Sequence, residues 1–184
     1  MHLICPADIV HAALQTDNGH YPGVFACQGG SCEHRGWYVP VETVHVQRYP
    51  RPPMECRHVH VRLLVIDDWE SASTMQWIPF RVDMGSPITI IPQVAIENGN
   101  IFRHNAVIGI DEVLSVRSEK ILGNNYSAVL QIGAPHLSEP AIVLRLPVFV
   151  TSFINLPYGL LGMDALKLID MSLDDAHCTF CPVG

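Results

Sequence analysis

The sequence predicts an all-β fold, and three observations support this prediction. Fourteen prolines and thirteen glycines are spread along the 184 residues and divide the chain into short segments. Many of these segments are rich in Val, Ile, Leu and Thr and are bounded by turn residues, as β-strands are. No segment keeps the 3.6-residue apolar period of a long helix. The expected strands cover residues 58–66, 75–82, 89–94, 128–132 and 142–151.

The rest of the chain completes this predicted organisation. One short helix is expected near the C-terminus, over residues 162–167. The composition changes at residues 49–53, Tyr-Pro-Arg-Pro-Pro, and residues 48–53 are expected to form an extended linker. Before this stretch the chain is rich in Gly, Cys and His, and after it the β pattern is dense. We therefore expect an N-terminal extension of uncertain structure over residues 1–56 and a β domain over residues 57–184.

Composition and charge exclude several classes of protein. Hydrophobic residues make up 48% and charged residues 16%, which argues against disorder. The net charge of −7 argues against a nucleic-acid partner. No apolar run approaches the ~20 residues of a membrane span, so no membrane partner is expected. The first residues lack a secretory pattern, so we expect a cytoplasmic protein whose six cysteines are thiols or metal ligands rather than disulfides.

Residues 77–92 form the segment that carries chemistry. An apolar strand runs directly into Asp83, Gly85 follows two residues later, and a second apolar strand begins at Thr89. A buried aspartate is costly unless it is hydrogen-bonded, and glycine lets a backbone turn tightly or approach another closely. The pattern thus predicts a carboxylate held at the mouth of a tight loop. An ordinary Asp-x-Gly turn also fits these residues alone, since Asp and Gly dominate turns for local reasons.

A second segment, at residues 156–166, favours a more specific interpretation. It contains two apolar residues, Gly, any residue, Asp, any residue and Leu. Together the two segments resemble the retropepsin family, the retroviral-type aspartic proteases, over roughly residues 57–175. The family's catalytic loop is matched by Asp83, Gly85, Ser86 and Thr89, and its later signature is matched by Leu160, Leu161, Gly162, Asp164 and Leu166.

The resemblance implies a closed β-barrel, the acid-protease fold, with one short C-terminal helix. It also implies a β-hairpin flap over the active site, where an extended polypeptide substrate binds by strand-like backbone hydrogen bonds. The flap tip is expected near residues 107–113, with Ile108, Gly109, Ile110 and Asp111 as its substrate-binding residues. A plain turn at Gly109 is the alternative. Asp164 is expected to have a structural role on the short helix, and no cofactor is implied.

The chemistry implied by the resemblance requires a pair of carboxylates that share one proton. One carboxylate acts as the general base on a water molecule, and the protonated one polarises the scissile carbonyl. This chain offers a single catalytic motif, because Asp111 has no following glycine. The pair therefore requires Asp83 from both chains of a homodimer, in which a two-fold axis brings identical residues together. A two-lobed single-chain protease would need a second motif and nearly twice this length.

Met84 departs from the family pattern, in which Thr or Ser follows the aspartate. In the family this hydroxyl forms hydrogen bonds across the dimer axis and stiffens the two active-site loops. A thioether is at best a weak acceptor and cannot donate a hydrogen bond. The alternative to an active endopeptidase is therefore a catalytically weak or inactive module of the same fold that serves dimerisation or peptide binding.

Cysteine and histidine residues define a further alternative, a zinc-binding structural β domain. Cys27, Cys32 and His34 could hold a metal ion, with Cys5 or Cys56 as the fourth ligand, since zinc prefers four such ligands. The spacing of the two cysteines lies at the edge of the usual range, and buried or free thiols fit the same residues. His58 and His60 alternate on an expected strand, and we interpret them as part of a solvated face.

Overall fold

The computed structural model describes residues 15–16, 19–20, 23–26, 35–48, 51–67, 74–96, 101–102, 107–114, 119–133 and 141–183. Nearly all regular structure in these residues is β, which confirms the predicted fold class. The helical elements described are one turn of α-helix, α1 (Met163–Leu166), and a 3-10 turn, η1 (Gln93–Ala95). The strands are β1 (Gln15–Thr16), β2 (Gly19–His20), β3 (Gly23–Ala26), β4 (Arg35–Arg48), β5 (Arg51–Asp67), β6 (Met75–Val82), β7 (Ile90–Pro92), β8 (Gly109–Leu114), β9 (Lys120–Ile132), β10 (Ile142–Thr151), β11 (Gly159–Leu161), β12 (Ile169–Leu173) and β13 (His177–Pro182).

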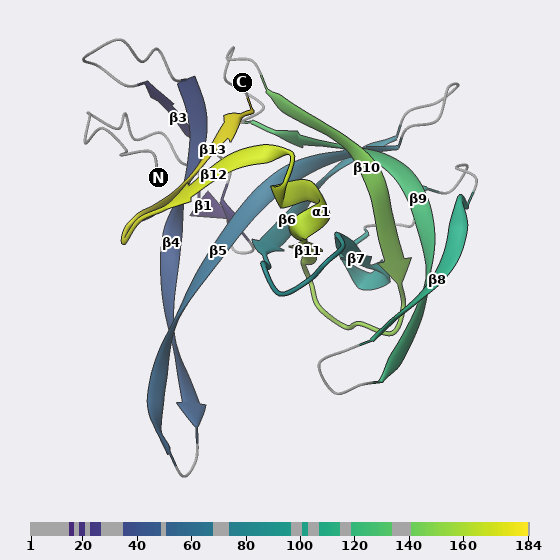
Figure 1. The fold of residues 1–184 in the computed structure, drawn as a ribbon, viewed down its shortest axis with the longest axis horizontal. Helices are drawn as coiled ribbons and strands as arrows, with labels where there is room; N and C mark the ends of the chain where they lie inside the picture. Colours follow the sequence, from purple (N-terminus) through teal and green to yellow (C-terminus); the bar gives the residue numbers. More distant parts are fainter. Residues whose placement is uncertain are drawn as a thin grey trace.

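Six strands close into a barrel around the hydrophobic core (Figure 1). β5 pairs with β6, β6 with β11, β11 with β7, β7 with β10 and β10 with β9, and β9 returns to β5. The β6–β11 and β7–β10 pairs are parallel, and the other four are antiparallel. This closed barrel with one short C-terminal helix is the architecture that the sequence predicts. Closure leaves no unpaired edge within the ring of six strands.

A two-residue apolar period explains which face of each barrel strand lies inside. Along β5, alternate residues from Val59 to Val65 are buried, and the residues between them are partly exposed. β10 follows the same period from Ile142 to Val148. Since successive side chains of a strand point to opposite faces, each strand contributes one face to the core. Burying one such Val, Ile or Leu side chain contributes about 1.5–3 kcal/mol to stability.

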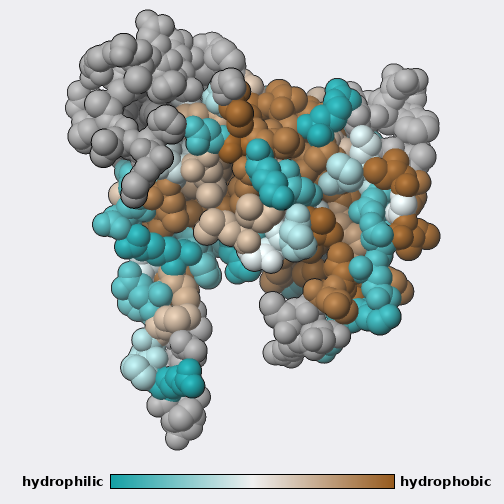
Figure 2. Space-filling view, viewed as in Figure 1, coloured by the Kyte–Doolittle hydropathy of each residue, from teal (hydrophilic) through white to brown (hydrophobic). Residues whose placement is uncertain are grey.

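β4 and β5 form a long hairpin, here called the arm, that extends away from the barrel (Figure 1). Arg48 lies opposite Arg51, and residues 51–53 belong to β5. The prediction of an extended linker at residues 48–53 is therefore wrong, because Arg48 ends one strand and residues 51–53 begin the strand paired with it. The expected boundary between residues 56 and 57 falls inside β5, which runs without a break from the arm into the barrel. Figure 2 shows mainly hydrophilic and intermediate side chains on this face of the arm.

Further strands extend the sheet beyond the barrel from β4. β13 and β3 pair with β4, and β12 pairs with β13. Trp37 and Val39 of β4 and Phe180 of β13 are buried in the same core as the barrel residues. Part of the N-terminal region and the C-terminal strands thus pack together with the barrel.

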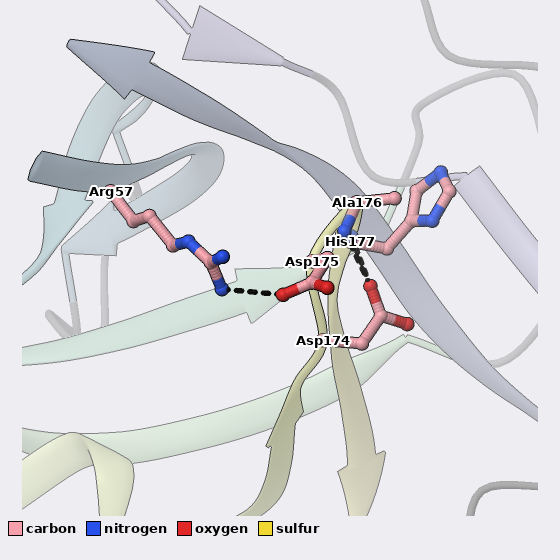
Figure 3. Close-up of polar contacts among 5 residues, drawn as sticks. All are labelled: Arg57, Asp174, Asp175, Ala176 and His177. Carbon is pink, nitrogen blue, oxygen red and sulfur yellow. Dashed lines mark hydrogen bonds and ion pairs between the residues drawn. The ribbon is translucent and has the colours of Figure 1, made fainter. Parts of the chain in front are cut away.

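The turn between β12 and β13 is fastened to β5 by polar contacts (Figure 3). Asp174 Oδ1 accepts hydrogen bonds from the N–H groups of Ala176 at 2.7 Å and His177 at 2.6 Å. Partial burial raises the pKa of Asp174, but these two hydrogen bonds and the nearby His177 ring outweigh burial, so the pKa lies below its usual value. The neighbouring Asp175 pairs with Arg57 of β5 at 2.8 Å. These contacts hold the C-terminal hairpin in place.

Candidate active site

Asp83 follows the last residue of β6 and opens a tight loop. Its N–H donates a hydrogen bond to the Leu161 carbonyl at 3.0 Å, because β11 runs parallel to β6 with Leu161 beside Val82. The Gly85 N–H donates to Asp83 Oδ1 at 3.0 Å, and the Ser86 N–H donates to the Asp83 carbonyl at 3.2 Å. The backbone and one carboxylate oxygen of Asp83 are thus fixed. None of the described residues donates a hydrogen bond to Asp83 Oδ2, which remains available to a further partner.

The residues that follow Asp83 differ in exposure and in role. Ser86 is buried, and its hydroxyl donates a hydrogen bond to the Ile88 carbonyl at 2.7 Å. Met84 is 63% exposed, at the position where the retropepsin pattern carries Thr or Ser. Ser86 therefore stabilises the loop itself, whereas Met84 projects from it into solvent.

Thr89 and Asp164 join the two sequence motifs into one structural unit. The Thr89 N–H donates to Asp164 Oδ2 at 2.9 Å, and the Thr89 hydroxyl donates to Asp164 Oδ1 at 2.7 Å. The same hydroxyl accepts a hydrogen bond from the Gly162 N–H at 3.2 Å. Backbone contacts add to this link, since the N–H of Met163 donates to the Ser86 carbonyl at 2.9 Å. The Asp83 loop therefore rests on the start of α1, and Asp164 occupies the structural position expected for it.

Gly162 is required by close backbone packing at this junction. A Cβ atom at Gly162 would lie 2.2 Å from the Ile88 carbonyl oxygen and 2.9 Å from the Thr89 nitrogen. Real Cβ atoms do not approach backbone atoms this closely, so a larger residue would separate α1 from the Asp83 loop. The glycine of the second motif thus has a steric explanation.

The expected flap residues lie in a β-hairpin, but the predicted tip is wrong. Gly109 is opposite Asn125, and Leu114 is opposite Lys120, so β8 and β9 are joined beyond Leu114. Gly109 therefore lies within a strand and not at the turn of the hairpin, which also excludes the alternative of a plain turn there. The Asn125 amide donates a hydrogen bond to Asp111 Oδ2 at 2.5 Å.

One face of the β8–β9 hairpin exposes apolar side chains. Ile108 is 56% exposed and Ile110 75%, and Leu114 and Leu122 are exposed as well. Figure 2 shows hydrophobic side chains gathered along the edge of the molecule where β8 and β9 lie. Lys120 and Glu112 form an ion pair at 2.9 Å beside this surface. The hairpin thus presents apolar area that the described part of the chain does not cover.

A polar cluster next to Asp83 was not anticipated from the sequence. It consists of Glu42, His60, Arg81 and Tyr158 and is here called the Arg81 cluster. Arg81 Nη1 donates a hydrogen bond to Tyr158 Oη at 3.3 Å, and its guanidinium carbon lies 5.4 Å from the centre of the Tyr158 ring. The His60 ring lies 5.3 Å from the Tyr158 ring, and His60 Nδ1 is 3.2 Å from Glu42 Oε2.

The positions of these residues explain why they meet. His60 is directly opposite Arg81 in the antiparallel β5–β6 pair, and Tyr158 immediately precedes β11, the other neighbour of β6. The His60 side chain is only 22% exposed, so the prediction of a solvated face is wrong for this residue. The sequence feature that could have identified Arg81 and Tyr158 is their position near the two motifs: Arg81 precedes Asp83 by two residues, and Tyr158 precedes Leu160 by two.

The described residues contain no group of three or more His, Cys, Asp or Glu side chains that could hold a metal ion. Cys27, Cys32 and His34 lie outside the described residues. Cys56, Cys178 and Cys181 are free thiols. Burial, and then the negative charge of Asp174, raise the pKa of Cys178 to about 12, so this thiol stays protonated and is a poor ligand or nucleophile.

The chain resembles solved structures in fold, but its sequence matches no known family or curated protein. No family model matches the chain, and no curated protein matches it. No helix in the described ranges has the length and apolar character needed to cross a membrane. Among solved structures, the chain is similar to a retropepsin-like aspartic protease from Rickettsia conorii, with a TM-score of 0.40 and 13% sequence identity over 76% of this chain and 92% of that chain.

Proposed function

We propose that this chain is one half of a homodimeric retropepsin-like aspartic endopeptidase, with Asp83 of each chain forming the catalytic pair. The observation that carries the proposal is the environment of Asp83. Its backbone and Oδ1 are held by hydrogen bonds, and its loop is anchored to α1 through Thr89 and Asp164. A catalytic carboxylate needs this kind of fixed position, because a misplacement of about 1 Å can cost roughly 10²-fold in rate.

The second carboxylate of the pair comes from a second copy of the chain in this proposal. The other acidic residues near the motifs already have partners, since Asp164 binds Thr89 and Asp111 binds Asn125. A two-fold axis beside the two loops brings Asp83 next to its own copy. At a separation of about 3 Å the two carboxylates cannot both ionise readily, so they share one proton and titrate as a pair.

The reaction follows from this shared proton. The ionised carboxylate accepts a proton from a water molecule as the water oxygen attacks the scissile carbonyl carbon. The protonated carboxyl donates its proton to the carbonyl oxygen, which gives a neutral tetrahedral diol. When the C–N bond breaks, one hydroxyl of the diol returns its proton to a carboxylate and the other carboxyl protonates the leaving nitrogen. The pair ends with one proton, as it began.

The substrate in this proposal is an extended polypeptide. A peptide that lies across the two Asp83 loops can form strand-like backbone hydrogen bonds with the chain that covers it. Within the described ranges, no strand pairs with the outer edge of β8, and Ile108 and Ile110 expose apolar side chains. We assign the hairpin to the flap, with Gly109 and Asp111 in its first strand.

Met84 favours a second candidate function, a catalytically weak or inactive module of the same fold that binds peptides or dimerises. Its exposed thioether cannot donate the hydrogen bond that the retropepsin pattern provides at this position. Without that bond the two loops can pair less rigidly, and turnover falls before binding does.

The experiment that separates the two functions combines a cleavage assay with a mass measurement. Sedimentation gives the oligomeric state, and a library of quenched fluorescent peptides at pH 4–7 reports cleavage. The proposed function predicts a dimer of two 20.4-kDa chains, cleavage that is lost in Asp83→Asn, and inhibition by a statine peptide. A dimer that binds the statine peptide but cleaves nothing supports the second function. A monomer that does neither contradicts both.

A further inference from the structure

We propose that Arg81, held by Tyr158, gives this site a preference for an acidic side chain beside the cleaved bond. This inference rests on the proposed function, because it assigns the kind of peptide that the Asp83 site accepts. It concerns the Arg81 cluster, to which the catalytic mechanism gives no role.

Arg81 lies on the same side of β6 as Asp83. Phe80 is fully buried and Val82 packs against the core, so these two side chains point inward. Because side chains of a strand alternate between faces, Arg81 points outward, and the same alternation carried one residue past the end of β6 places Asp83 on that side. Two residues of a strand span about 7 Å. When a peptide bond lies at the Asp83 carboxylate, the side chain of a residue beside that bond can therefore reach the Arg81 guanidinium.

The charge on Arg81 is available for a ligand. Within the described residues, the Arg81 side chain pairs with no carboxylate, and its contacts are the Tyr158 hydroxyl at 3.3 Å and the Tyr158 ring. Glu42 contacts His60 and not Arg81. A guanidinium has five N–H donors arranged as a rigid fork, and the bond to Tyr158 uses one group of that fork. The remaining donors suit a carboxylate, which can accept two parallel hydrogen bonds.

Tyr158 and His60 orient this charge. The Tyr158 ring centre is 5.4 Å from the Arg81 guanidinium carbon and 5.3 Å from the His60 ring centre, and His60 is held in turn by Glu42. A cation over an aromatic face is attracted to it, which limits the rotamers of a long flexible side chain. A side chain that is already oriented loses less entropy when a ligand binds.

The negative net charge of the chain limits any preference for an acidic side chain to the neighbourhood of Arg81. The net charge of −7 repels an acidic peptide at long range, so an acidic side chain is favoured only where a cation lies within a few ångströms. In the proposed dimer each chain contributes one Arg81, one on either side of the two-fold axis. The preference therefore applies to the residues on both sides of the scissile bond.

The test uses matched peptides that differ only in Glu or its neutral isostere Gln at the two positions flanking the scissile bond. We expect kcat/KM to be about tenfold higher for Glu in the unmodified dimer, the effect of a charged hydrogen bond that is partly exposed. Arg81→Gln should reduce this ratio to about one. Arg81→Glu should reverse it, so that a Lys peptide is cleaved faster than the Gln peptide. This gain cannot come from misfolding.

Arg145→Gln is the matched control, because Arg145 is exposed on β10 and its loss removes the same charge at another site. It should keep the Glu preference. The inference is overturned if the Glu-to-Gln ratio of kcat/KM is near one in the unmodified protein, or if Arg81→Gln leaves the ratio unchanged. In both cases, cleavage of the peptides still supports the proposed function. If no peptide is cleaved, binding of the same fluorescent peptides decides. If the Glu peptide binds more tightly than the Gln peptide and Arg81→Gln removes the difference, the acidic preference stands and the peptidase function is rejected. If neither peptide binds, the preference and the peptidase function are both rejected.

Discussion

The Thr89 hydroxyl donates a hydrogen bond to Asp164 Oδ1 at 2.7 Å, although 75 residues separate the two in sequence. Thr89 follows the Asp83 loop, and Asp164 lies in α1. This contact explains why two short motifs, each ambiguous alone, occur in the same chain. Asp164, from the second motif, fixes Thr89 of the first motif by hydrogen bonds. The first motif also contains Asp83, the carboxylate proposed for catalysis.

Replacing Thr89 by Val should destabilise the fold. The change keeps the shape but removes the hydroxyl that donates to Asp164 and accepts from Gly162, so buried groups lose partners. We expect a loss of about 2–3 kcal/mol in the free energy of unfolding, measured by urea denaturation. Thr179→Val is the control, because its buried hydroxyl makes one long bond of 3.4 Å to the Ser172 carbonyl. Equal losses in the two variants would contradict the role given to Thr89.

Replacing Gly162 by Ala should be more harmful than its small size suggests. The added methyl group meets the Ile88 carbonyl oxygen at 2.2 Å, so α1 and the Asp83 loop must move apart. We expect a loss of about 3 kcal/mol or more in stability. Gly109→Ala is the matched control, since its Cβ would meet only the Asn125 amide at an ordinary 3.6 Å. A Gly162→Ala protein as stable as Gly109→Ala would show that the packing is looser than described.

Replacing Met84 by Thr should strengthen the proposed dimer. The new hydroxyl can donate a hydrogen bond across the two-fold axis, and each bond formed contributes about 1 kcal/mol. The dimer dissociation constant, measured by sedimentation, should fall about tenfold or more, and kcat/KM should rise. Monomer stability should change by less than about 0.5 kcal/mol because Met84 is exposed. Met75→Thr, also at an exposed methionine, should leave the dissociation constant unchanged. If Met84→Thr also left the dissociation constant unchanged, residue 84 would not lie at the dimer contact.

Asp174 should make stability depend on pH. Its pKa is lowered in the folded state, so its contribution is present above the unfolded pKa of about 3.8 and is lost as the pH falls through the folded pKa. Asp174→Ala removes the acceptor of two backbone hydrogen bonds and should cost about 1 kcal/mol at pH 7. The difference should shrink toward pH 2. Arg57→Gln, which breaks the exposed pair with Asp175, should cost less. An Asp174→Ala effect that is the same at pH 2 and pH 7 would exclude the charge as its cause.

Local patterns were enough to predict much of the fold. The expected strands at residues 75–82 and 142–151 coincide with β6 and β10, and the expected helix contains α1. These segments have apolar periods that match their structure, and the turn residues around them define their ends. The sequence also placed Asp164 on the short helix, where the structure has it, but not its contact with Thr89.

Contacts between distant residues could not be predicted in this way. The Arg81–Tyr158 contact joins residues 77 positions apart, and it depends on β11 lying parallel to β6, which no local pattern specifies. Residues 51–53 were misassigned because prolines usually mark linkers, whereas here they occupy the exposed end of a hairpin. The flap tip was misplaced because a glycine inside a strand resembles one in a turn.

The distance between the two Asp83 carboxylates in a dimer tests the central claim most directly. A crystal structure of the protein with a bound statine peptide would measure it. We expect the two carboxylates to lie about 3 Å apart at the two-fold axis, on either side of the statine hydroxyl. A closed dimer in which the two Asp83 side chains lie far beyond hydrogen-bond distance would contradict the proposed catalytic pair.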